Sequence, residues 1–146
     1  MADFTYSPNG LALTQQFEGL RLTAYQDQVG RWTIGYGHTG PNVHGGMTIT
    51  QDQASQLLQS DVAGAVTCVN NAVTTLITQN QFDALVDFVF NLGCASLLSS
   101  TLLRLINTAD YADAAPQFLR WDHAGGVVVP GLLTRRQAEM TLFQTP

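Results

Sequence analysis

The chain has no lysine: all six basic residues are arginine, and 11 acidic residues leave a net charge of −5 over 146 residues. Such a balance offers no basic face of the kind that binds nucleic acid by releasing counterions. No apolar run approaches the ~20 residues that a membrane-spanning helix needs. Residues 1–10 have neither the basic nor the apolar region of a signal peptide. We therefore expect a soluble protein made in the cytoplasm, with no nucleic-acid partner and no membrane insertion.

Cysteine and histidine are also scarce. Cys68 and Cys94 are 26 positions apart, which fits neither a CxxC motif nor a zinc site. They favour two buried thiols, with a disulfide formed after release into an oxidising compartment as the alternative. The three histidines, His38, His44 and His123, lack the spacing of metal ligands, so we expect no metal and no cofactor.

Glycine is unevenly distributed, and its distribution divides the chain. Seven of the 13 glycines fall between residues 19 and 46, which indicates turns and short strands. Strand character at 21–25 and 31–34, with a turn at 27–30, predicts a hairpin. Strands segregated from helices indicate the α+β class. We expect one domain over 1–146, with a β-lobe over 15–50, a helical lobe over 51–146 that also holds a helix over 8–20, and a cleft between the lobes.

Capping residues and apolar periodicity place the helices. Pro8 suits the first position of the first helix. A capping box at Thr50 begins a helix of about 20 residues, the longest expected, which could bridge the lobes. A second capping box at Thr78 begins a helix that stops at Gly93. Further helices are predicted over 100–106, over 110–121 with a kink or an earlier end at Pro116, and over 132–143 after a turn at 125–126.

One of only two glutamates lies at the end of the first helix. Glu18 has Phe17 and Leu20 beside it, and apolar neighbours favour the protonated form that a general acid needs. Asp27 follows nine positions later in the hairpin turn, and Thr33 six positions after that on the returning strand. We expect the hairpin to bring Asp27 and Thr33 to one side of a cleft that faces Glu18. Two carboxylates flanking a sugar bond are the general requirement for glycoside hydrolysis.

The sequence around these residues narrows the interpretation. Residues 17–27, FEGLRLTAYQD, and residues 30–39, GRWTIGYGHT, resemble the N-terminal signature of phage-type lysozymes, the muramidase endolysins of glycoside hydrolase family twenty-four. The E-x8-D-x5-T spacing and the TIGYGHT run both match, and the similarity continues through 81–93, 100–103 and 121–139. The resemblance implies a lysozyme-like fold and catalytic roles for Glu18, Asp27 and Thr33. It also implies cleavage of the β-1,4 bond between N-acetylmuramic acid and N-acetylglucosamine.

Four further residues are candidates for binding substrate near the cleft. Tyr36 and His38 belong to the TIGYGHT run, where His38 suits a structural or substrate-shaping role better than that of a general base. Phe90 and Asn91 are predicted to line the cleft. A core position for Phe90 and a helix-end cap for Asn91 are equally compatible with the sequence.

The arginine pair near the C-terminus is the last candidate. Arg135 is predicted to bind substrate, and the resemblance implies that Arg135 or Arg136 pairs with Glu18. A cation there would favour the charged form of Glu18 and oppose the effect of its apolar neighbours. Glu139, one turn further on, could instead pair with one arginine within the helix.

The expected reaction is direct attack of water with inversion, because Asp27 and Thr33 can activate and hold that water. A lytic transglycosylase on a similar fold would need one glutamate and no such pair. A catalytically inactive wall-binding protein would need neither the glutamate nor the Asp27–Thr33 pair. By family analogy, we expect a monomer that stays in the host bacterial cytoplasm until a holin opens the membrane, and that then acts on peptidoglycan in the periplasm.

Overall fold

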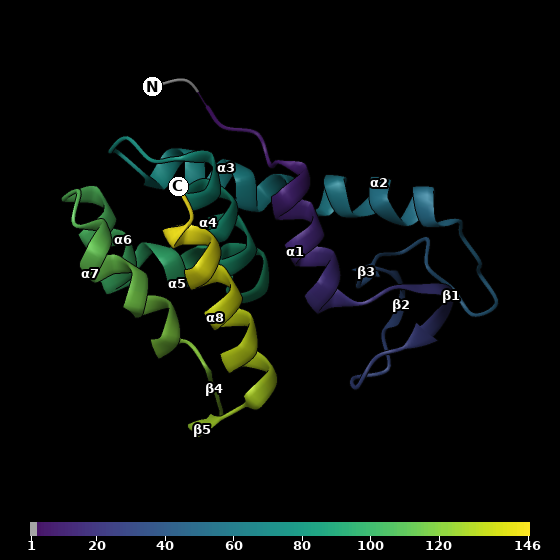
Figure 1. Ribbon diagram of the computed structural model, residues 1–146. Coiled ribbons are helices and arrows are strands. Elements are labelled where there is room, and N and C mark those ends of the chain that lie inside the picture. Colours follow the sequence, from purple (N-terminus) through teal and green to yellow (C-terminus); the bar gives the residue numbers. More distant parts are fainter. Residues whose placement is uncertain (1–2) are drawn as a thin grey trace. The chain divides into compact units, whose positions relative to one another are not determined.

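The structure, a computed structural model that describes residues 3–146, divides into two compact units. One unit spans Thr14–Ala63, and the other takes in the residues up to Leu13 together with Gly64–Pro146. The chain passes between the units within helix α1, Pro8–Glu18, and again between Ala63 and Gly64. Strands and helices occupy largely separate stretches of the chain (Figure 1), which confirms the predicted α+β class.

The Thr14–Ala63 unit is built on a three-stranded antiparallel sheet. Strands β1 (Arg21–Gln26), β2 (Trp32–Gly35) and β3 (His38–Thr39) lie in that order, and β2 is central. Helix α2, Gln51–Asp61, packs against β2 and β3 (Figure 1). The predicted hairpin is therefore present. The units divide at residue 63 and not at 50, because α2 packs on the strands.

The long helix expected from Thr50 is two helices. The capping box at Thr50 is present, but α2 ends at Asp61, and Val62 caps it by donating its N–H to the Leu58 carbonyl. Helix α3, Ala63–Ala72, follows at once, with the weak helix former Gly64 in its first turn. The prediction of one helix of about 20 residues was therefore wrong; the longest described helix is α8, with 15 residues.

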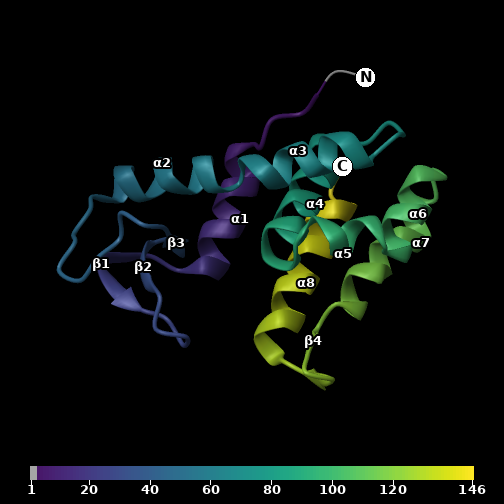
Figure 2. The same ribbon diagram turned by 180° about the vertical axis from the view of Figure 1, so that it is seen from behind.

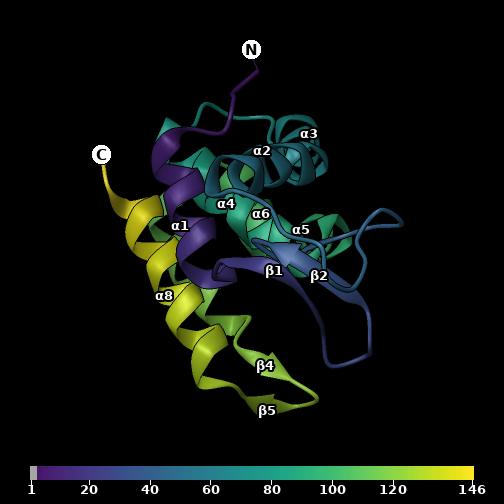
Figure 3. The ribbon, with the colours of Figure 1, turned by 90° about the vertical axis from the view of Figure 1, so that its right-hand side faces the viewer.

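The second unit is mostly helical. The capping box at Thr78 and the stop at Gly93 are confirmed as the ends of α4. The helix predicted over 110–121 is an α-helix only as far as Ala114. A 3₁₀ helix follows it, with Pro116 in the first turn. The turn at 125–126 joins two short strands that lead into α8 (Figure 3). In chain order the elements are α3, α4 (Gln79–Leu92), α5 (Cys94–Leu98), α6 (Thr101–Asn107), α7 (Tyr111–Ala114), the 3₁₀ helix η1 (Ala115–Arg120), β4 (His123–Ala124), β5 (Val127–Val128) and α8 (Pro130–Gln144).

Helix α4 is the centre of this unit. Eight consecutive residues, Phe82–Val89, are buried, and α4 packs along α8 (Figure 2). Cys68 on α3 and Cys94 on α5 form a disulfide with an S–S distance of 2.08 Å. The preference for two buried thiols was therefore wrong, since packing brings the two Cα atoms to 6.0 Å, within reach of a disulfide. Within residues 3–146, none of the helices combines the length and apolar character that a membrane span requires.

Candidate active site

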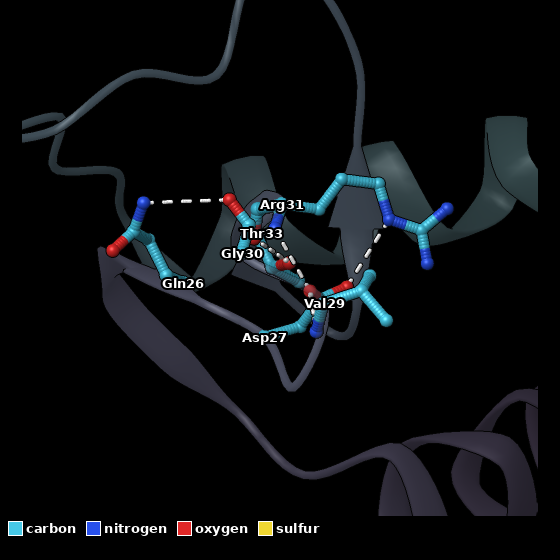
Figure 4. Close-up of polar contacts among 6 residues, drawn as sticks. All are labelled: Gln26, Asp27, Val29, Gly30, Arg31 and Thr33. Carbon is cyan, nitrogen blue, oxygen red and sulfur yellow. Dashed lines mark hydrogen bonds and ion pairs between the residues drawn. The ribbon is translucent and has the colours of Figure 1, made fainter.

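The carboxylate of Asp27 is held firmly in the turn between β1 and β2. Its Oδ1 accepts hydrogen bonds from the backbone amides of Val29, at 3.0 Å, and Arg31, at 2.8 Å (Figure 4). Its Oδ2 accepts one from Nε of Arg31 at 3.1 Å. The bond from the Arg31 amide lowers the pKa of Asp27 below its usual value; the guanidinium and the Val29 amide lower it further, against partial desolvation. The turn therefore favours the ionised form of the Asp27 carboxylate.

Thr33 is tied to the same turn from the neighbouring strand. It lies on β2, opposite Tyr25 on β1, and is 4% exposed. Its hydroxyl donates a hydrogen bond of 3.0 Å to the Arg31 carbonyl, which leaves the lone pairs of Oγ1 to accept from another group. Asp27 and Thr33 therefore lie in one hairpin, as predicted, and both form hydrogen bonds with the backbone of Arg31 (Figure 4).

Glu18 is the last residue of α1, as predicted, and its carboxyl group lies against the turn between β2 and β3. A Cβ added at Gly37 in that turn would stand 3.0 Å from Oε1 of Glu18. Gly37 also has a φ of +80°, which L-residues with a side chain rarely adopt. The second glycine of TIGYGHT therefore leaves room for the Glu18 carboxyl group.

This contact predicts the effect of Gly37→Ala. The positive φ should cost about 1–2 kcal/mol of stability, and the new methyl group should displace the Glu18 carboxyl group, so that activity falls by about tenfold or more. Gly46→Ala is the matched control, since its φ is +84° and nothing lies within 4 Å of its added Cβ. Thermal unfolding and turbidity assays of both variants would test this. Equal activity in the two variants would contradict the contact.

Two candidates from the TIGYGHT run have mainly structural surroundings. His38 on β3 contacts Oδ2 of Asp61 through Nδ1 at 2.8 Å and so links the sheet to α2. This contact gives His38 a structural part in the fold, and its predicted part in shaping or binding substrate stays a prediction. Tyr36 is 6% exposed and belongs to the buried apolar residues. Its predicted contact with substrate therefore finds no support in its burial.

The candidates in the helical unit belong to a buried charge cluster between α4 and α8. Arg135 is 5% exposed and binds Asp87 at two points, from Nε at 2.9 Å and from Nη2 at 2.8 Å. Nη2 of Arg136 donates to Oδ1 of Asn91 at 2.8 Å and to Oε2 of Glu139 at 3.0 Å. The pairing of Glu139 with an arginine of its own helix is thus confirmed.

The burial and hydrogen bonds of these residues indicate structural roles for them. The guanidinium of Arg135 is committed to Asp87, which argues against its predicted contact with substrate. Asn91 holds Arg136 and does not cap the helix, while Phe90 is partly buried and packs on the apolar core. The pKa of Glu139 is raised well above its usual value, first by desolvation and then by its hydrogen bond and proximity to Asp87, despite the two arginines.

Two important residues carried weak sequence signals. Arg31 lies four positions from Asp27, but that spacing is a pairing signal only on helices, and here it spans a turn. Asp87 appears in an apolar stretch, and its partner Arg135 is 48 positions away. No group of three or more potential metal-ligating His, Cys, Asp or Glu side chains occurs in the described part of the chain.

The chain is similar to known phage lysozymes in both sequence and structure. Residues 15–139 match the protein family described as phage lysozyme. The chain is 44% identical over 143 residues to an endolysin of Acyrthosiphon pisum secondary endosymbiont phage 1, covering 95% of this chain and 97% of the relative. It is also 44% identical over 141 residues, 95% of its length, to an endolysin of Bacillus phage B103, of which it spans only 54%. The muramidase domain of SpmX from Asticaccaulis excentricus has a similar structure, with a TM-score of 0.89, 42% identity, and coverage of 97% of this chain and 99% of that one.

Proposed function

The chain belongs to the phage lysozyme family, and on that premise we propose that Glu18, Asp27 and Thr33 are the catalytic residues of a peptidoglycan-hydrolysing endolysin. The enzyme is a muramidase, a glycoside hydrolase with the lysozyme-like α+β fold. One observation carries the assignment of residues: Asp27 and Thr33 are bound to the same residue, Arg31, within one hairpin of the unit that also holds Glu18.

The proposed chemistry divides between the two carboxyl groups. Glu18 gives its proton to the oxygen of the glycosidic bond as that bond breaks. A water molecule donates one hydrogen bond to Thr33, whose own proton points to the Arg31 carbonyl. Asp27, kept ionised by its three donors, takes the other proton as the water attacks the sugar carbon from the opposite face. The product sugar then has the inverted configuration.

The enzyme acts on the bacterial cell wall. We further propose that it reaches the wall as a monomer, from the host cytoplasm, after a holin has opened the membrane. This route rests on the family resemblance. Expression of the chain alone should then leave cells intact until the membrane is breached, and lysis with an intact inner membrane would count against the route.

Product analysis tests the reaction. Mass spectrometry of digested peptidoglycan should detect free reducing ends on N-acetylmuramic acid, formed by the addition of water. NMR during early turnover should detect the inverted anomer of that sugar first. Anhydro-muramic ends would instead identify a lytic transglycosylase, and a retained anomer would refute direct displacement. Binding without any new reducing ends would identify an inactive wall-binding protein.

A further inference from the structure

Arg31 contributes more to the hairpin than the charge of an exposed turn residue. We propose that Arg31 is a positioning residue for hydrolysis, an inference that rests on the proposed roles of Asp27 and Thr33. It holds the Asp27 carboxylate in the one orientation from which that group can take a proton from the attacking water.

Four hydrogen bonds connect Arg31 to the two residues (Figure 4). Its amide donates to Oδ1 of Asp27 at 2.8 Å, and its Nε donates to Oδ2 at 3.1 Å. Its carbonyl accepts from the Asp27 amide at 2.8 Å and from the Thr33 hydroxyl at 3.0 Å. Because the two carboxylate oxygens have different donors on one residue, the carboxylate cannot rotate without losing a bond.

Only one of these bonds depends on the arginine side chain. The amide and carbonyl bonds would persist with any residue that keeps its backbone N–H, so Oδ1 of Asp27 and the Thr33 hydroxyl would remain fixed. The Nε bond alone fixes Oδ2. A lysine could supply the charge, but its ammonium lacks the planar, directed donors of a guanidinium. The side chain therefore sets the orientation of the carboxylate within a turn that its backbone already closes.

The neighbouring charged groups are engaged elsewhere. Arg21 on β1 lies 4.5 Å over the ring of Tyr25, and His38 on β3 contacts Asp61 of α2. Glu18 precedes β1 and lies against Gly37. The charge of Arg31 is partly screened, since its side chain is 67% exposed. We therefore expect orientation to contribute more than attraction to its effect on the reaction.

Three variants test this inference: Arg31→Gln, Arg31→Lys and, as a control, Arg21→Gln, which removes the same charge from the same hairpin. Arg31→Gln should lower kcat by about five- to twentyfold while KM stays within about twofold, because the geometry of the reacting groups is lost and binding is not. Asp27 acts in its ionised form, so loss of Arg31 should move both its carbon-13 NMR titration and the acid limb of the kcat profile to higher pH. In Arg31→Lys, the acid limb should return closer to its wild-type pH than kcat returns to its wild-type value. Arg21→Gln should leave both the acid limb and kcat unchanged.

Several results would overturn the inference. It fails if Arg31→Gln keeps kcat and the Asp27 titration of the wild type, or if Arg31→Lys restores kcat completely, since charge alone would then suffice. Asp27→Asn, assayed in parallel, separates this failure from that of the proposed function. An active Asp27→Asn variant would refute the role of Asp27 itself, whereas an inactive one beside a fully active Arg31→Gln would refute only the role of Arg31.

Discussion

Replacing Glu18 with glutamine is expected to lower kcat by roughly a hundred- to ten-thousand-fold, the usual contribution of a general acid. The amide has nearly the shape of the acid and can occupy the same place against Gly37. It has no proton that it can release to the leaving oxygen of the sugar. A turbidity assay on permeabilised Gram-negative cells measures the loss, and thermal unfolding checks that the variant folds.

Asp52→Asn is the matched control for Glu18→Gln. Asp52 is an exposed acid in the first turn of α2, in the same compact unit, so the substitution removes one negative charge without touching the hairpin. It should leave lysis close to that of the wild type. If Glu18→Gln and Asp52→Asn lysed cells equally well, Glu18 could not be the catalytic acid.

Local signals account for most of what the sequence predicted correctly. The capping boxes at Thr50 and Thr78 depend on residues three positions apart, and both formed as predicted. The hairpin around Asp27 is equally local, because turn residues and strand alternation decide it. The break at Val62 was missed since the apolar period continues through it. Periodicity alone does not show where one helix gives way to the next.

Contacts between distant positions are what the sequence could not show. Arg135 resembled a substrate ligand in the sequence, and only the packing of α8 on α4 shows that it binds Asp87. Tyr36 likewise lies near the proposed catalytic residue Thr33 in the TIGYGHT run, but the fold buries it. The charge cluster is a tertiary feature, so the family pattern could point to its residues but not to their partners.

Replacing Asp87 with alanine is expected to destabilise the protein by about 3–5 kcal/mol, the usual cost of breaking a buried ion pair. Arg135 would lose the carboxylate that accepts from two of its nitrogens while remaining inside the protein, where an uncompensated charge is costly. Glu139 can offset part of this loss. Asp87 contributes to its raised pKa, so without Asp87 the Glu139 carboxyl group should ionise more readily beside the arginines. We therefore expect a value near the lower end of the range.

Urea denaturation of Asp87→Ala measures the loss, and the double variant Asp87→Leu/Arg135→Met identifies its cause. Removing both charges and filling their space with apolar groups should recover most of the stability, because the cost lies in the unpaired cation and not in the missing bond. Asp113→Ala, which removes an exposed acid from the same unit, should change stability by less than about 1 kcal/mol. A double variant no more stable than Asp87→Ala would show that the cluster stabilises the packing of α4 on α8 through its specific hydrogen bonds.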